Sequence, residues 1–215
     1  MKNMIASAVA IAIALGASSA LAGDGFNGPY GGLKLGYGFG QYSGDYTTPS
    51  GSTTLDGIGS RGPSVGALAG YGRTFGQKND VYLGGELDVT MSSITADAST
   101  SGGATAEITE QHSGIAAARA GFLPHENWLL FGRLGVGATQ HEVELAGSGM
   151  SQTHDERQMT YLAGVGVEGM VAENVSLRMD WSYRFQEEET FFFGNDTLTV
   201  EPATGIAEIA VTYHF

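Results

Sequence analysis

Residues 175–185 read VSLRMDWSYRF, and this stretch decides the fold. Every odd-numbered residue in it is apolar or aromatic, and every even-numbered residue is Ser, Arg or Asp. Side chains alternate between the two faces of a β-strand, whereas an amphipathic helix repeats its apolar residues every three to four positions. The stretch therefore predicts a strand with one apolar face and one charged face.

Seven more segments of the chain repeat this alternation. In the first of them, Leu33, Leu35 and Tyr37 share one face and Lys34 lies on the other among glycines. The seven segments are 30–42, 64–75, 81–92, 112–122, 128–140, 157–170 and 205–215. Segments 112–122 and 157–170 show the pattern less clearly because Ala and Gly dominate them. Together with 175–185, these segments predict an all-β fold, an eight-stranded antiparallel up-and-down barrel.

The connections between the segments alternate in length. Short turns are expected at 76–80, 124–127 and 172–174, and long polar connections at 43–63, 93–111, 141–156 and 187–204. Transmembrane β-barrels typically have short periplasmic turns on one rim and long extracellular loops on the other. We assign most of the acidic residues to the four long loops, with Glu110 among them and only Arg61 and Arg157 opposing them. Phe191–Phe193 is expected to continue a strand above the membrane.

Alternation alone fits two kinds of barrel, because a soluble lipocalin-like barrel turns its apolar face inward and a membrane barrel turns it outward. The polar face distinguishes them, since it combines five cations, five anions and many glycines. Such a set suits a narrow lumen, where buried charges need partners and small residues leave room for long ones. We therefore expect a structural charge network in the lumen, made of Lys34, Glu86, Asp88, Arg119, Arg133, Glu168, Arg178, Asp180, Arg184 and Glu208.

The N-terminal residues have the three parts of a secretory signal peptide. Lys2 precedes an apolar run from Met4 to Leu15, and Ala20-Leu21-Ala22 has the small-x-small pattern of a cleavage site. The run is too short for a membrane anchor. We expect a signal peptide over residues 1–22 and a barrel domain over residues 23–215. The chain has no cysteine, so disulfides do not hold the exported domain together.

The last strand carries the apolar face to the terminal residue through Tyr213 and Phe215. This ending resembles the signal that the outer-membrane barrel assembly machinery reads. The stretches YLGGELD at 82–88, RAGF at 119–122, NWLLFG at 127–132 and GVGVE at 164–168 resemble OmpA-like eight-stranded barrels. The alphaproteobacterial porin-family or surface-antigen barrels are the most similar group. The resemblance implies an architecture and a location in the bacterial cell outer membrane, but no activity.

No motif has the spacing of a catalytic or metal-binding site. His112, His141 and His154 each stand beside a polar or acidic residue, but nothing in their spacing positions a nucleophile and its base. The run Glu187-Glu188-Glu189 lacks EF-hand spacing, and charge runs are usually solvated. The net charge of −13 leaves no basic patch for nucleic acid. We expect no catalytic residue, no cofactor, no metal and no nucleic-acid partner.

The expected role is structural and exposed at the cell surface. A lumen filled with ion pairs should conduct poorly, which favours envelope integrity and surface interaction through the acidic loops. The alternatives are a small-solute porin and, less favoured, a barrel enzyme that modifies lipid A or cleaves proteins. The expected partners are outer-membrane lipid and lipopolysaccharide, the barrel assembly machinery, and a host or surface ligand at the loops. We expect a monomer.

Overall fold

The computed structural model describes residues 25–48, 51–76, 78, 80–99, 105–147, 150–186, 189–193 and 196–215. The signal peptide expected over residues 1–22 lies outside these ranges and stays a prediction. Among the described residues, no helix has the length and apolar character needed to cross a membrane. Most of these residues belong to β-strands.

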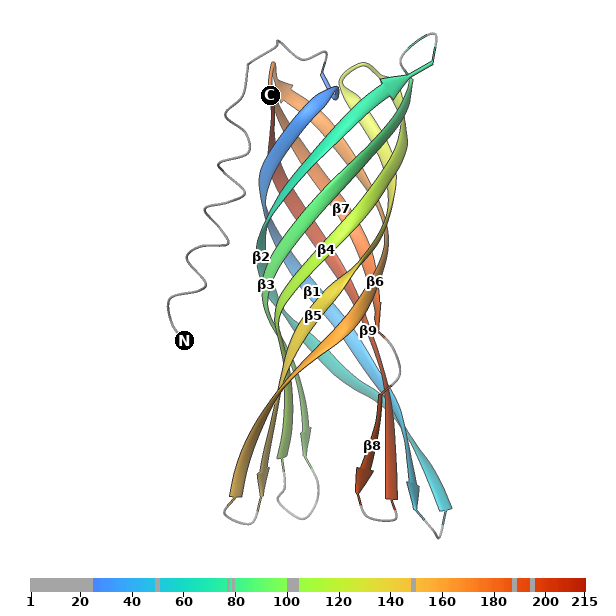
Figure 1. The fold of residues 1–215 in the computed structure, drawn as a ribbon, viewed down its shortest axis with the longest axis vertical. Helices are drawn as coiled ribbons and strands as arrows, with labels where there is room; N and C mark the ends of the chain where they lie inside the picture. The colour runs from blue at the N-terminus through green and yellow to red at the C-terminus, as the bar shows by residue number, and fades with distance from the viewer. Residues whose placement is uncertain are drawn as a thin grey trace.

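The strands form one antiparallel sheet that closes on itself (Figure 1). Neighbours in sequence are neighbours in the sheet from β1 to β7; β9 follows β7, and its pairing with β1 completes the ring. The short strand β8 pairs with the first part of β9. The bounds are β1 Gly28–Thr48, β2 Gly51–Phe75, β3 Val81–Ser99, β4 Thr105–His125, β5 Trp128–Gly147, β6 Met150–Ala172, β7 Val175–Gln186, β8 Glu189–Phe193 and β9 Asp196–His214. The predicted eight-stranded up-and-down barrel is confirmed.

The long connections are more regular than the sequence suggested. β1 and β2 stay paired as far as Thr48 and Gly51, and β5 and β6 as far as Gly147 and Met150. The expected loops are therefore largely the outer parts of β-hairpins, which project at the bottom of Figure 1, opposite the short turns. The apolar alternation stops where lipid stops, although backbone pairing continues. The sequence pattern therefore marked the membrane wall and not the ends of the strands.

The two faces of the wall have opposite compositions. Apolar side chains take the outward positions, where Leu33 is 70% exposed and Leu134 is 68% exposed. Polar and charged side chains take the inward positions, as in the alternating burial of Val175–Gln186. A soluble barrel would bury its apolar residues, so this arrangement excludes the lipocalin-like alternative. So large an apolar outer wall is stable only against lipid.

Aromatic side chains occupy the outer face towards both ends of this wall. On the hairpin side, Tyr183 packs against Phe185 with ring centroids 4.8 Å apart. On the short-turn side, Tyr213 packs against Phe215 with centroids 4.9 Å apart, and Trp128 is exposed beside the turn before β5. Such aromatic girdles mark the two membrane interfaces of outer-membrane barrels.

Replacing Leu134 by Arg should destabilise the barrel in a bilayer by roughly 2–4 kcal/mol, because the new charge would face the middle of the lipid. The matched control is Ser93→Arg, an outward substitution near the hairpin-side interface, where the cost should be about 0–1 kcal/mol. Equilibrium unfolding by urea in lipid vesicles measures both values. Equal costs for the two variants would contradict a lipid-facing wall.

Candidate functional site

All ten residues expected to line the lumen are buried inside the barrel, with exposed fractions of 8% or less. They come from β1, β3, β4, β5, β6, β7 and β9. Nine of them form a continuous set of ion pairs, whereas Arg184 pairs separately with Glu110. Buried charges are tolerated only when they have partners, so the contacts of each side chain decide whether the interior is stable.

The centre of the network surrounds Lys34 and Arg133. The Lys34 Nζ atom lies 2.7 Å from Asp88 and 2.8 Å from Glu208. Arg133 lies between the same two carboxylates, 3.1 Å from Asp88 and 3.8 Å from Glu208, and it also reaches Asp180 at 3.4 Å. Two cations thus share three acids across the barrel axis, which ties β1, β3, β5, β7 and β9 together through side chains.

Glu86 is the most highly connected acid of the network. It lies 2.7 Å from Arg178, 3.5 Å from Arg119 and 3.6 Å from Arg133, so three guanidinium groups meet at one carboxylate. Arg178 also donates to Asp180 at 2.8 Å, and Arg119 donates to Glu168 at 2.6 Å. Tyr30 donates to Glu86 at 3.0 Å and accepts a hydrogen bond from Arg119 at 3.1 Å.

Glu110 belongs to this interior, which corrects its assignment to a long loop. It is 1% exposed, accepts a 2.7 Å hydrogen bond from Arg184, and also accepts one from Ser92 at 3.0 Å. From Ser113 to Arg119 the inward residues of β4 are odd-numbered. Before Ser113 the register with β5 shifts, between Glu110 and His112. This β-bulge adds one residue and turns the even-numbered Glu110 inward. If the alternation of residues 113–119 is extended towards the start of β4 without the bulge, it wrongly predicts that Glu110 faces outward.

An apolar layer closes the lumen at the short-turn end. Phe26, Tyr82, Leu129 and Phe131 form a buried cluster that also contacts Leu123 and Met170. Cation–π contacts join this apolar layer to the layer of ion pairs. The Arg119 guanidinium lies 4.0 Å and the Arg178 guanidinium 4.8 Å from the Phe131 ring centre. This cluster could not be predicted from the sequence pattern, because inward aromatic residues depart from the alternation of polar inward and apolar outward positions.

Phe26 reaches the lumen from the segment just before β1. Its ring makes an edge contact with His214 at 5.7 Å, and the neighbouring Asn27 side chain accepts a 2.7 Å hydrogen bond from the Thr74 backbone. The Phe215 backbone N–H donates to Pro29 at 3.0 Å. The expected assembly residues Tyr213 and Phe215 thus lie at the seam between β9 and β1, with Tyr213 on the outer face. Their recognition by the assembly machinery stays a prediction.

A cluster of Ser176, His214 and Glu168 has the residue types of a catalytic triad but a different geometry. Ser176 Oγ donates to Glu168 at 2.6 Å and lies 3.0 Å from His214 Nε2, which is itself 3.2 Å from the same carboxylate. In a triad the carboxylate holds Nδ1 and leaves Nε2 for the serine. Here both partners meet Nε2, and Ser176 is fully buried. The cluster supports the interior and offers no accessible nucleophile.

The other histidine candidates are not arranged for catalysis either. His112 is exposed on the outer face, whereas Ser113 points inward and accepts a hydrogen bond from Arg184. His141 is buried, and Glu142 accepts a hydrogen bond from Gln111. The side chains of His154 and of Glu187–Glu189 lie outside the described residues. Within the described part, no group of three or more His, Asp or Glu side chains could hold a metal ion.

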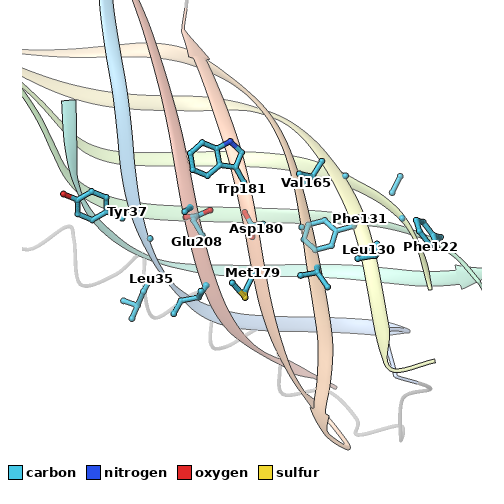
Figure 2. Close-up of a pocket in the computed structure, with 18 residues that line it drawn as sticks. Leu35, Tyr37, Phe122, Leu130, Phe131, Val165, Met179, Asp180, Trp181 and Glu208 are labelled. Atoms are coloured by element: carbon cyan, nitrogen blue, oxygen red, sulfur yellow. The ribbon is translucent and has the colours of Figure 1, made fainter. Parts of the chain in front are cut away.

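Two large concavities lie on the lipid-facing wall, and their linings also include Arg119, Arg133, Asp180 and Glu208 of the charged network. The larger, about 920 Å³, follows the outer side chains of β1, β4, β5, β6, β7 and β9, including Leu35, Val165 and Trp181 (Figure 2). A second of about 740 Å³ lies over β3 to β7 and shares Val165 and Trp181 with the first. Because these four charged side chains are buried, the surface exposed in both concavities is almost entirely apolar, which suits lipid chains better than polar substrates.

Glu86→Gln should lower the free energy of unfolding by about 3–5 kcal/mol, because it leaves three buried guanidinium groups short of a negative charge. Glu110→Gln is the matched control, since Glu110 pairs with Arg184 alone among the described cations, and its cost should be smaller. Urea unfolding of both variants in vesicles, followed by tryptophan fluorescence, compares them. A cost for Glu86→Gln no greater than that for Glu110→Gln would contradict the central position of Glu86.

Comparison with known proteins agrees with this architecture. Residues 8–215 match the family described as outer membrane protein beta-barrel domain, and no curated protein matches the chain. The outer membrane protein OprG from Pseudomonas aeruginosa has a TM-score of 0.55 at 14% identity, over 89% of this chain and 99% of that chain. Neisserial surface protein A has a TM-score of 0.44 at 17% identity, over 88% and 98% of the two chains. Ail, the attachment invasion locus protein of Yersinia pestis, has a TM-score of 0.42 at 14% identity, over 87% and 99%.

At 14% identity the OprG structure shows a common fold and no common activity. The family match is the stronger finding, because it covers nearly the whole chain. It agrees with the closed antiparallel ring and with the apolar outer wall. The chain therefore belongs to the outer membrane protein beta-barrel family and is a protein of the bacterial outer membrane.

Proposed function

We propose that the protein is a non-catalytic surface barrel that supports the outer membrane and acts through its long hairpins, with a lumen that is closed to solutes. The observation that carries the proposal is the filling of the interior by a connected ion-pair network and the separate Arg184–Glu110 pair, above an apolar layer. An eight-stranded barrel is just wide enough for its own side chains. A solute crossing this lumen would have to separate buried ion pairs and displace a packed aromatic cluster.

The hairpins are the parts of the chain left for contact with the outside. They extend beyond the apolar wall, and their backbone register places several acidic residues opposite one another, such as Asp97 with Glu107 and Glu107 with Glu144. Like charges in facing positions weaken a β-sheet, so these acids favour a use in binding over a use in stability. A basic host or surface ligand has the complementary charge.

A small-solute porin and a barrel enzyme are the competing functions. The porin is disfavoured by the closed interior, since both layers would have to open together. An enzyme that modifies lipid A or cleaves protein would need an accessible nucleophile or a separated acid–base pair. The most triad-like cluster is fully buried, and its geometry is that of a structural hydrogen-bond network.

In planar lipid bilayers the wild-type protein should give no stable conductance steps. The double variant Arg178→Ala/Phe131→Ala removes one member of each lumen layer and should give small, irregular steps. Leu134→Ala, a truncation on the outer wall, is the matched control and should stay silent. Large and stable steps from the wild-type protein would overturn the closed-lumen proposal in favour of the porin.

Cells that lack the protein should become more sensitive to detergents and bile salts, and the silent wild-type barrel should restore their resistance. A variant shortened in the β3–β4 hairpin by removal of residues 97–107 should still show heat-modifiable migration on a denaturing gel, because the apolar wall is intact. It should bind basic surfaces more weakly, because Asp97 and Glu107 are removed. A change in the mass spectrum of lipid A that depends on the protein would instead support the enzyme.

A further inference from the structure

A row of polar side chains crosses the outer wall just above its apolar band. His112 on β4, Gln140 on β5 and Arg157 on β6 are direct register partners, with Gln140 opposite both of the others. His112 and Arg157 are exposed, and their strands continue below into apolar outward residues such as Met159 and Tyr161. Adjacent strands are about 4.8 Å apart, so the three side chains span roughly 10 Å of the hairpin-side interface.

The cation in this row, Arg157, has no carboxylate partner among the residues whose side chains the structure describes. Every lumen cation has a carboxylate partner, whereas no carboxylate of the described residues lies within 4.0 Å of Arg157. The nearest outward acid along β5 is Glu142, two residues beyond Gln140, and it accepts a hydrogen bond from Gln111. In a chain of net charge −13, an outward arginine at a membrane boundary that no described carboxylate approaches points to an anionic partner.

An apolar groove begins on the same strands below the row. The concavity of about 740 Å³ is floored by Ala118, Gly132 and Ala163 and walled by larger side chains such as Leu134 and Trp181. Between the groove and the row lies Gly114, where an added Cβ would meet nothing within 4 Å. On β4 the wall therefore carries no side chain at this position between the polar row and the groove.

The depth of the groove matches the length of one lipid leaflet. His112 and Ala118 are six residues apart on β4, which corresponds to roughly 20 Å along a strand. A strand tilt near 45° converts this length into a depth of about 14 Å, close to half of a hydrocarbon core about 30 Å thick. The polar row therefore lies at the outer interface and the groove near the midplane.

We infer that the outer wall over β4, β5 and β6 is a binding site for a phosphorylated lipid of the outer leaflet, lipopolysaccharide. Its phosphoryl group is held by Arg157 with His112 and Gln140 as further hydrogen-bond donors, and an acyl chain lies in the groove at Ala118 and Gly132. Charge complementarity selects the head group, and the row lies on the hairpin side, which faces out of the cell. The site is on the outside of the barrel, so it does not depend on whether the lumen conducts.

Titration of the purified protein with diphosphoryl lipid A, followed by native mass spectrometry, tests the site. The wild-type protein should hold this lipid roughly tenfold or more tightly than the same lipid after removal of its phosphates, since a charged hydrogen bond contributes about that factor. Arg157→Gln/His112→Gln should remove the preference. Ala118→Leu, which fills the groove, should weaken the binding of both lipids.

Two matched controls separate this site from general attraction to the barrel. Arg73→Gln removes an outward arginine at the opposite interface, where its guanidinium lies 5.9 Å from the Phe75 ring, and Ala69→Leu enlarges an outward residue on β2 away from the groove. Both should bind as the wild type does. Equal loss with Arg73→Gln, no loss with the double variant or with Ala118→Leu, or equally tight binding of phosphatidylglycerol would overturn the site. Heat-modifiable migration confirms that each variant is folded.

Discussion

Closure of the backbone hydrogen-bond ladder is the constraint on which the rest of this structure depends. A strand edge left open in hydrocarbon would carry a row of unpaired N–H and C=O groups, and each such group costs several kcal/mol. The pairing of β9 with β1 removes that edge. Once the cylinder is closed, each residue of the wall faces either lipid or a narrow interior, and the period of two in the sequence follows from this choice.

The interior is the harder of the two environments to fill. It is too narrow for bulk water, yet the side chains that face it include five cations and, with Glu110, six acids. Long arginine side chains reach across the axis to acids on distant strands, as Arg178 does to Glu86. Because three arginines share Glu86, the strands are tied together by a connected network, and only the Arg184–Glu110 pair stands apart from it among the described ion pairs. The aromatic cluster beneath it gives two of these guanidinium groups a flat surface to lie on.

Residues 175–185 show how much of the architecture could be predicted from the sequence. Their alternation identified a wall strand and assigned Arg178, Asp180 and Arg184 to one face, because lipid and lumen impose opposite polarity on neighbouring positions. The same reasoning failed where that contrast is absent. In the hairpins water surrounds both faces, so the pattern disappears although β1 and β2 remain paired to Thr48 and Gly51. At the bulge before His112 one added residue reversed the phase, and Glu110 was misplaced. Phe26 lies before the first strand, where no periodicity exists to place it.

The hydrogen bond from Phe215 to Pro29 brings the last strand of the cylinder within reach of the first. Each strand of the closed ring has a neighbour on both sides, so the chain could begin at any strand and still form the same ring. A short linker between these two residues, with new ends opened at a hairpin tip, would leave each inter-strand ladder of the wall intact. Such circular permutants would separate two properties that coincide in the natural chain, the geometry of the cylinder and the position of its terminal aromatic residue.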